Sequence, residues 1–580
     1  MSAAVQEKVK EFAGHSSPGT WFLSKESDIE QYPALLPYAH YLRQAWTALQ
    51  LSGVLCVEQR PSVYLCGGND FTAHQKRQYH RFAWNQGLVP VLIFLTPNQV
   101  EVHSTVKKPE KQSQDRHLFD KDLSSLIKKF DSVAETLETA RLVRTIETGQ
   151  FFQSNALFFP KKETVDRCLV ENLVHTTRKL KEANWDLSQA HALLGRALFV
   201  SFLQERKFIK AHYYPNGTTS LLEILDSSTV ERAKQLLYRE FFPRLKREFN
   251  GTMFDDALAK EEREVRKVHL DILRDFLSGH DMESGQMTLD FWAYDFSSIP
   301  VETISAIYEE FMKDTDLEKR RSEGAYYTPR HLAETTLHVA LEHRYHESAG
   351  WRVLDPACGS GIFLVGMFNL LAEQWRRENS NRRKQTKAQG LLKILQTQIR
   401  GVDVNPDACR ITAFSLYLAL FEKLRPIDVD EFKERVRYED FLPPFFLDES
   451  SESPQPSKPI ILCGNFLEDQ LGLETNFDLI IGNPPWDSRG DKQIALHFAR
   501  HSSEFVRDGG VGCLLLPSTI LVNRYGTLDG TWFRAVAVER IVQLLISGSS
   551  SLKRHIHASS YATPKQLQHR IMSSRMKLRS

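Results

Sequence analysis

The sequence has 580 residues, of which 42% are hydrophobic and 25% are charged, and its formal net charge at pH 7 is +1. This composition indicates an ordinary soluble globular protein of about three domains. Because the charge is nearly balanced, any surface that binds nucleic acid must be a local patch. The longest apolar run, LVPVLIFL, is far too short to cross a bilayer, which argues against a membrane-spanning protein.

Neither the cysteines nor the N-terminus indicates export or a metal site. The seven cysteines form no CxxC pair and show no metal-site spacing. They fit a reducing compartment. The first residues, MSAAVQEKVKEF, lack the basic and then apolar pattern of a signal peptide. We therefore expect a cytoplasmic protein with no resident metal and no membrane partner.

The first half of the chain divides by its apolar periodicity. Residues 1–150 alternate strand-like runs such as GVLCVEQ with the helical run HQKRQYHRFAWNQ, which predicts a small α/β domain. The Lys-rich segment that begins at Thr105 could contact phosphates, but its pattern favours a solvated linker and a helix face. Residues 151–320 have helical spacing almost throughout and predict a helical connector.

A glycine-rich turn follows the first strand of the next part. WRVLD reads as an apolar strand, CGSG as a turn, and IFLVGMFNLLAEQW as a helix. Gly359 and Gly361 let the backbone approach a ligand closely, and the helix N-terminus behind them offers unpaired N–H groups. In a doubly wound α/β sheet, ligands bind between strand end and helix start.

Two further strand ends carry polar residues. The strand QIRGVDV ends near Asp403, and an acid in this place commonly takes the ribose hydroxyls in dinucleotide folds. The strand FDLII ends in NPPW, Asn483 to Trp486. Each proline fixes its own φ and biases the preceding residue toward extended geometry, so the Asn483 side chain and nearby carbonyls form a stiff acceptor site.

Such an acceptor site suits methylation of an amino nitrogen whose lone pair is conjugated into a ring or a carbonyl. Acceptors on the N–H hydrogens draw the nitrogen toward sp3 geometry as the transition state forms. The aromatic ring of Trp486 can stack on a flat substrate. Alone, NPPW also fits an ordinary turn after a strand, but in a chain that also contains DPACGSG it favours the methylation site.

Five motifs occur in a characteristic order, which is GAYYTP, DPACGSG, GVDVNP, GNF and NPPW. Together they resemble the γ-class N6-adenine DNA methyltransferases, especially the long enzymes of type IIG restriction-modification and phage-exclusion systems. The motifs cover about residues 300–546. The resemblance implies an α/β, Rossmann-like methyltransferase domain over residues 321–546 that uses S-adenosylmethionine. It also implies transfer of a methyl group to adenine N6 in DNA, with the target base flipped out of the duplex.

The resemblance also assigns residues to the site. The catalytic residues would be Asn483, Pro484, Pro485 and Trp486. The residues that bind the cofactor would be Thr328, Asp355, Ala357, Gly359, Gly361, Asp403, Asn465 and Phe466. The family usually has Asp where Asn465 stands, but an amide can still accept from the adenine amino group. Phe466 would stack on the adenine of the cofactor.

The N-terminal position holds a nuclease in the type IIG enzymes that the chain resembles. Such a nuclease needs clustered carboxylates and a lysine to hold Mg²⁺ and activate water. The nearest candidates here are Glu58 with Arg60 and the isolated Asp70, and they do not supply that set. We therefore expect a domain that is degenerate or does not cut DNA.

Residues 547–580 contain seven Lys and Arg, no acidic residue and no apolar periodicity, which predicts a disordered basic tail. In the family this position continues the sheet and leads to a target-recognition domain. We therefore expect either a separate specificity or restriction subunit that directs the chain to DNA, or a truncated product with an impaired site. Two other functions stay open: a methyltransferase that acts on protein glutamine, and a non-catalytic subunit that binds DNA or other proteins.

Overall fold

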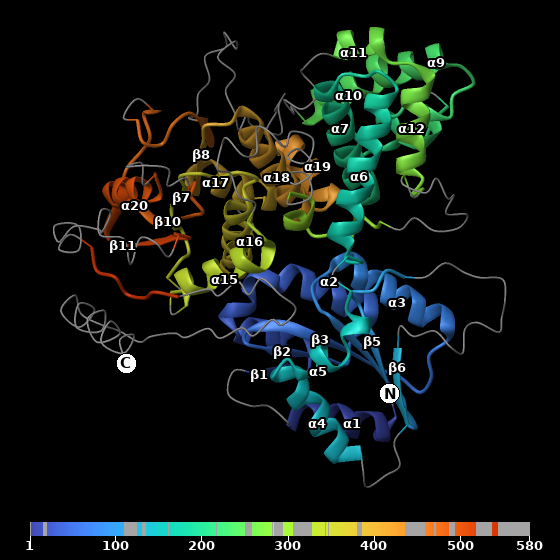
Figure 1. The fold of residues 1–580 in the computed structure, drawn as a ribbon, viewed down its shortest axis with the longest axis vertical. Helices are drawn as coiled ribbons and strands as arrows, with labels where there is room; N and C mark the ends of the chain where they lie inside the picture. Colours follow the sequence, from blue (N-terminus) through green and yellow to red (C-terminus); the bar gives the residue numbers. More distant parts are fainter. Residues whose placement is uncertain are drawn as a thin grey trace, which may run out of the picture.

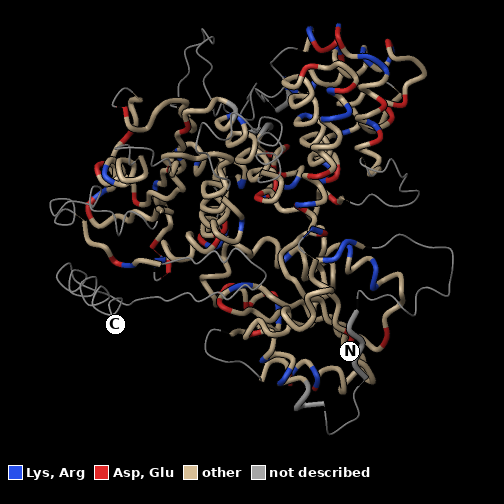
Figure 2. Tube along the Cα trace, viewed as in Figure 1, with Lys and Arg blue, Asp and Glu red and all other residues tan. Residues whose placement is uncertain are grey.

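The chain, described here from a computed structural model, forms a mixed α/β protein with two sheets and a helical bundle (Figure 1). Basic and acidic residues are interleaved along all three parts, in keeping with the net charge of +1 (Figure 2). The structure describes residues 2–14, 20–109, 125–129, 135–160, 162–215, 217–249, 258–280, 282, 294–305, 328–342, 344–345, 347–379, 386–435, 459–468, 471–486, 494–517 and 536–542.

The N-terminal part is a six-stranded sheet whose strands lie side by side in chain order. Only β3 and β4 are parallel, and the other neighbours are antiparallel. The strands are β1 (Thr20–Leu23), β2 (Gly53–Val57), β3 (Arg60–Gly67), β4 (Val91–Leu95), β5 (Gln99–Ser104) and β6 (Ser125–Lys129). The α-helices are α1 (Ala3–Gly14), α2 (Ala39–Leu49), α3 (Ala73–Gln86), α4 (Glu135–Glu147) and α5 (Gln150–Ser154).

Both faces of this sheet are apolar, so helices cover both. Successive side chains of a strand point to opposite faces. In β3, Val63 and Leu65 pack in the cluster that contains α1 and α4, whereas Tyr64 and Cys66 pack in the cluster that contains α2 and α3. This part of the chain therefore contains a sheet with helices on both of its faces.

One prediction for this part is wrong. The Lys-rich segment from Thr105 was expected to be a linker and a helix face, but its residues Ser125–Lys129 form β6. Antiparallel pairing with β5 supplies the backbone partners of this strand. Local composition carries no signal for a partner strand that lies earlier in the chain. Residues 110–124 of the segment lie outside the described part.

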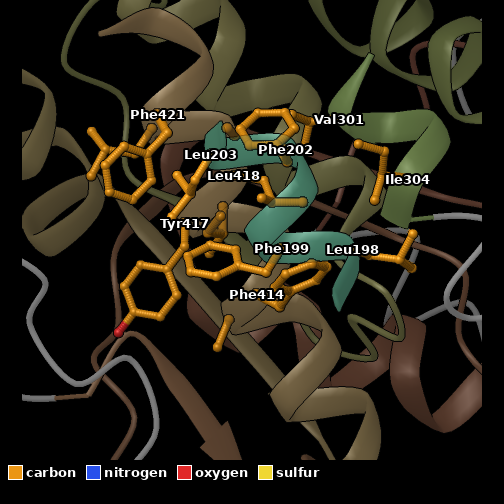
Figure 3. Packing of buried hydrophobic residues seen from close by; sticks show 14 of the residues in the cluster. Leu198, Phe199, Phe202, Leu203, Val301, Ile304, Phe414, Tyr417, Leu418 and Phe421 are labelled. Carbon is orange, nitrogen blue, oxygen red and sulfur yellow. The ribbon is translucent and has the colours of Figure 1, made fainter. Parts of the chain in front are cut away.

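The middle of the chain is a helical bundle. Its α-helices are α6 (Val165–Glu182), α7 (Leu187–Glu205), α8 (Leu221–Leu225), α9 (Val230–Lys234), α10 (Phe242–Phe249), α11 (Leu258–Glu264) and α12 (Lys267–Leu277). Asp186 caps α7, because its side chain accepts from the backbone N–H of Ser188 and Gln189. Helix α7 is apolar almost all round and packs its Phe199 against Phe414 in the next part (Figure 3).

The last part contains a five-stranded, fully parallel sheet in the order β11-β10-β7-β8-β9. Its strands are β7 (Val353–Asp355), β8 (Ile399–Asp403), β9 (Ile461–Cys463), β10 (Phe477–Gly482) and β11 (Val506–Leu514). The α-helices are α15 (Arg330–Leu341), α16 (Ile362–Glu378), α17 (Lys387–Gln398), α18 (Pro406–Lys423), α19 (Pro426–Arg435) and α20 (Ile494–Phe505).

Both faces of the parallel sheet are covered. Val353 and Leu479 join the large core that contains α16 and α18, whereas Leu354 and Ile480 join a smaller cluster with Phe498 of α20. This arrangement explains the nearly continuous apolar runs of its strands. The α/β class and the doubly wound parallel sheet are confirmed.

Helices that cover the two sheets are joined by partly buried polar contacts. Arg43 of α2 donates to both carboxylate oxygens of Glu373 on α16, at 2.9 and 2.7 Å. Burial alone would raise the pKa of Glu373, but hydrogen bonds from Arg43 and Arg376 hold that pKa below its ordinary value. A bidentate Arg–carboxylate pair of this kind fixes orientation as well as distance.

The predicted domain boundaries stay predictions. The division near residue 150 falls at the start of α5, whereas the divisions near residues 320 and 546 and the whole segment 547–580 lie outside the described residues. None of the helices that the structure describes combines the length and the hydropathy needed to cross a bilayer.

Candidate active site

The DPACGSG and NPPW motifs lie on neighbouring strands at the same edge of the parallel sheet. The chain runs outward from β7 through β8 to β9 and then returns to the other side of β7 as β10 (Figure 1). The strand order therefore reverses between β7, which ends at Asp355, and β10, which ends at Gly482. In open α/β sheets, ligands bind in the crevice at such a switch point.

The glycine turn leads into α16 as expected. Gly359 and Gly361 have φ values of 55° and 80°, which are in the left-handed region, and α16 begins at the next residue, Ile362. Thr412 of α18 holds the turn, because its hydroxyl donates to the Gly359 carbonyl at 2.8 Å. A Cβ on Gly361 would lie 2.8 Å from the Thr412 Cγ2 atom. Glycine is therefore required there by both backbone conformation and space.

Asp355 is fully buried at the end of β7. Its Oδ1 atom accepts a hydrogen bond from the Ala357 N–H at 3.1 Å. Its Oδ2 atom is buried and has no hydrogen-bond partner among the residues that the structure describes. Burial raises the pKa of this carboxyl well above its ordinary value, and the nearby Asp403 adds to that effect. A Cβ on Gly482 would lie only 2.6 Å from Asp355 Oδ1, so the ends of β7 and β10 are in close contact. A cationic group of a ligand placed here would lower that pKa and pair with the ionised carboxylate.

Asp403 joins the end of β8 to the glycine turn. Its Oδ2 atom accepts from the Gly359 N–H and its Oδ1 atom from the Asn405 N–H, both at 2.9 Å. Sequence reasoning gave Asp403 to the ribose and did not foresee its role in holding the turn. A carboxylate has about four lone-pair sites, so ribose hydroxyls can still bind to it.

Val404, directly after Asp403, was missed by sequence reasoning. This residue, which directly follows β8, is 66% exposed and is one of four large apolar residues that are exposed in the described part of the chain. An apolar side chain there can pack on the flat face of an adenine. The sequence signal that could have pointed to Val404 was its position directly after Asp403, the acidic residue at the end of β8.

Asn465 and Phe466 lie after β9 and make local or core contacts. The Asn465 amide donates to Glu468 at 2.9 Å and accepts from the Leu467 N–H at 3.2 Å. The Phe466 ring is 2% exposed and packs on Phe498 with ring centroids 5.5 Å apart. Phe466 thus contributes to the core, and its stacking on a cofactor adenine stays a prediction.

Asn483 follows β10 directly and contacts Thr328, which the sequence had assigned to a different part of the site. Asn483 Nδ2 donates to the Thr328 hydroxyl at 3.1 Å. Asn483 Oδ1 is buried and has no hydrogen-bond partner in the part of the chain that the structure describes. Pro484 is buried and Pro485 is half-buried. Tyr326 and Tyr327 of the GAYYTP motif lie outside the described residues.

Trp486 is held beside this acceptor. Its indole N–H donates to the Leu515 carbonyl, which follows β11, at 3.2 Å. The hydrogen bond fixes one edge of the ring while the side chain stays half-buried. The described residues contain no group of three or more His, Cys, Asp or Glu side chains that could hold a metal ion.

Comparison with known proteins gave one family match and several similar solved structures. Residues 301–506 match the family model described as N-6 DNA methylase. Among solved structures, the chain is similar to the type IIL restriction-modification enzyme MmeI in complex with DNA, with 15% identity, a TM-score of 0.42, and coverage of 68% of this chain and 55% of MmeI.

Two other solved structures are similar to the chain. The type IIG restriction endonuclease BpuSI shows 14% identity, a TM-score of 0.30, and coverage of 87% of this chain and 53% of BpuSI. The type I methyltransferase subunit from Streptococcus thermophilus shows 14% identity, a TM-score of 0.34, and coverage of 64% and 78%. The chain spans about half the length of MmeI and BpuSI. The family match confirms the resemblance seen in the motifs: residues 301–506, the part of the chain that carries the site, match the N-6 DNA methylase family model.

Proposed function

We propose that this chain transfers a methyl group from S-adenosylmethionine to the N6 amino group of adenine in DNA. The observation that carries this proposal is the buried Oδ1 atom of Asn483, which has no hydrogen-bond partner in the described chain. Leaving a buried acceptor unpaired costs about 1–3 kcal/mol. A donor that arrives with the substrate removes this cost, and an amino group is such a donor.

The acceptor also explains how the amino group becomes reactive. The N6 lone pair of adenine is conjugated into the ring and is a poor nucleophile in that state. As the new bond to carbon forms, the nitrogen becomes tetrahedral and its N–H hydrogens become more acidic. Asn483 Oδ1 binds an amino N–H, and this interaction strengthens in the transition state. Because Asn483 is fixed by Thr328 and followed by Pro484, little reorganisation is needed.

The residues around the glycine turn fit S-adenosylmethionine. When bound, this cofactor supplies a methyl group activated by a sulfonium. The unpaired Asp355 Oδ2 atom fits the cationic amino group of its methionine part. Asp403 would accept from the ribose hydroxyls, and Val404 would cover the adenine. The backbone at Gly359, with no Cβ in the way, would lie against the ligand.

DNA is the proposed partner, and the target adenine would leave the duplex, because its amino group is otherwise inaccessible to the site. Trp486 would stack on the extruded base. We further propose, from the motif resemblance, that the chain works in a restriction-modification or phage-defence system in the cytoplasm. A separate specificity subunit would then supply the target sequence, and the N-terminal sheet would not cut DNA.

The test is methyl transfer with the purified chain, radiolabelled cofactor and unmethylated DNA, with and without proteins encoded beside it. Label is expected in DNA, and nucleoside analysis should identify it as N6-methyladenine. Asn483→Ala should lower the rate by more than about tenfold, a loss above about 1.4 kcal/mol, and should change cofactor affinity less than twofold. Asn98→Ala, at an exposed turn between β4 and β5, is the matched control.

Three results would contradict the proposal. Label in protein instead of DNA would favour a glutamine methyltransferase. A methylated base other than adenine would exclude the substrate. An Asn483→Ala variant with wild-type activity would remove the role of the acceptor. Sequence-specific methylation by the isolated chain would contradict only the separate specificity subunit.

A further inference from the structure

Helix α15 connects the candidate site to the N-terminal sheet. It begins at Arg330, two residues after Thr328, whose hydroxyl accepts from Asn483 at 3.1 Å. Thr328 is only 7% exposed, so it is fixed between the start of this helix and the end of β10. The backbone of a helical turn moves as a unit, because each carbonyl is bonded to the next turn. Pro329, which joins Thr328 to the helix, accepts at its carbonyl from the N–H groups of Leu332 and Ala333, so a contact that holds the first turn of α15 also restrains Thr328.

Arg60 makes such a contact. It is the first residue of β3, and its Nη2 atom donates to the His331 carbonyl at 3.0 Å and to the Thr335 hydroxyl at 2.5 Å. The two acceptors belong to consecutive turns at the start of α15. The sequence brought Arg60 to attention only as a poor nuclease candidate beside Glu58. Its contacts are instead with the helix that leads to the site.

The hairpin that presents Arg60 has an uncommon backbone. Val57 pairs directly with Arg60, so only two residues turn the chain, and both of them, Glu58 and Gln59, have positive φ values of 48° and 66°. This is the conformation that two-residue hairpins need, but it usually selects Asn or Gly. Each such residue costs roughly 1–2 kcal/mol. A tight and strained turn fixes the start of β3, and with it the base of the Arg60 side chain.

A second contact reaches the same turn of α15. The Arg330 guanidinium lies 5.9 Å from the ring centroid of Tyr41 on α2, and it donates to the Thr303 hydroxyl at 3.2 Å. The Tyr41 hydroxyl is buried and lies 2.5 Å from an oxygen of Glu302. Cation–π contacts of this kind are stronger when they are desolvated. The N-terminal sheet thus holds the start of α15 through both β3 and α2.

We propose that the N-terminal sheet positions the methyl-accepting end of the site, with Arg60 as a positioning residue that acts through α15 and Thr328 on Asn483. This rests on the proposed function. The packing of α15 does not depend on Arg60, because Leu337 is buried against α16, where a Cβ on Gly366 would lie 2.5 Å from Leu337 Cδ1. Loss of Arg60 should loosen the first turn of α15 and leave the helix folded.

Arg60→Ala tests this proposal in the full-length chain. The turnover number for methyl transfer should fall about tenfold, whereas the KM and the Kd for S-adenosylmethionine should stay within twofold of wild type. Backbone hydrogen exchange should become faster in residues 329–336 and stay unchanged in β7 and β8. Arg60→Lys keeps a donor that can reach one of the two acceptors, so it should restore part of the rate. Arg144→Ala on α4, whose side chain is 70% exposed, removes the same charge and should change none of these quantities.

The outcomes separate this proposal from the proposed function. If the wild-type chain methylates DNA and Arg60→Ala keeps more than half of its turnover number, positioning by Arg60 is wrong. Equal losses of turnover and cofactor affinity would show a general structural effect, which also overturns it. If the wild-type chain transfers no methyl group, the proposed function fails. Exchange in residues 329–336 then decides whether Arg60 holds α15, and unchanged exchange rejects that link.

Discussion

Replacement of Asp403 by alanine would test the link between β8 and the glycine turn. The Asp403 carboxylate accepts from the N–H groups of Gly359 and Asn405, both at 2.9 Å. Alanine would leave these two donors without their partner, at a cost of about 1–3 kcal/mol for each buried group. Both positions are half-buried, so water would satisfy part of the lost bonding. We therefore expect cofactor binding to weaken by about 1–3 kcal/mol in total, or roughly 5- to 150-fold in Kd.

Isothermal titration calorimetry with S-adenosylmethionine measures this change directly. Asp403→Asn keeps one acceptor oxygen and should lie between wild type and Asp403→Ala. Asp508→Ala, at an exposed position of β11, serves as the control and should leave Kd unchanged. A change below twofold in Asp403→Ala would refute the reasoning, because neither the turn nor the ribose contact would then depend on this carboxylate. An equal change in the control would show that the effect is not specific.

Two further predictions concern stability. Burial and the neighbouring Asp295 raise the pKa of Glu205 from 4.5 to about 8. The contribution of Glu205 to stability is therefore full below pH 4.5 and is lost as the pH rises through 8. The midpoint of thermal unfolding should fall over that range, and Glu205→Gln should flatten this pH profile. An equally steep profile in the variant would contradict the assignment. Gly361→Ala should cost about 1–3 kcal/mol of stability, because φ is 80° and the new methyl would meet Thr412 at 2.8 Å. Gly14→Ala is the control, because a Cβ there would have no atom within 4 Å, and it should cost far less in the same melting experiment. Equal unfolding midpoints for the two variants would refute the prediction that alanine is strained at position 361.

The parts of the site that sequence reasoning predicted are those where the signal is local. The strand, turn and helix around Gly359 follow from apolar periodicity interrupted by glycines, and the structure has β7, the turn and α16 in these places. Asp403 and Asn483 were singled out because each follows an apolar run directly, and their roles in the site stay predictions. Parallel strands place their carboxyl ends at one edge, so the sequence also indicated that these residues belong to one site.

The features that sequence reasoning missed depend on long-range contacts. The packing of Phe466 on Phe498 of α20, a helix that follows the next strand, β10, was not foreseen, and the stacking of Phe466 on a ligand stays a prediction. Arg60 and the carbonyl that it binds are 271 residues apart in the chain. β6 forms because β5 offers it an edge, although its own composition favours a linker. Periodicity describes which face of an element is apolar, and it carries no information about the partner that covers it.

Two buried polar atoms without partners lie at the ends of neighbouring strands, and their proximity connects the two halves of the site. They are Asp355 Oδ2 on β7 and Asn483 Oδ1 after β10. Gly482, the last residue of β10 and the one directly before Asn483, lies against Asp355, since a Cβ there would be 2.6 Å from the carboxylate. Each such atom costs about 1–3 kcal/mol for as long as it stays unpaired. One ligand with a cationic amino group and a second with an amino donor would satisfy both, which matches a cofactor and a base bound side by side.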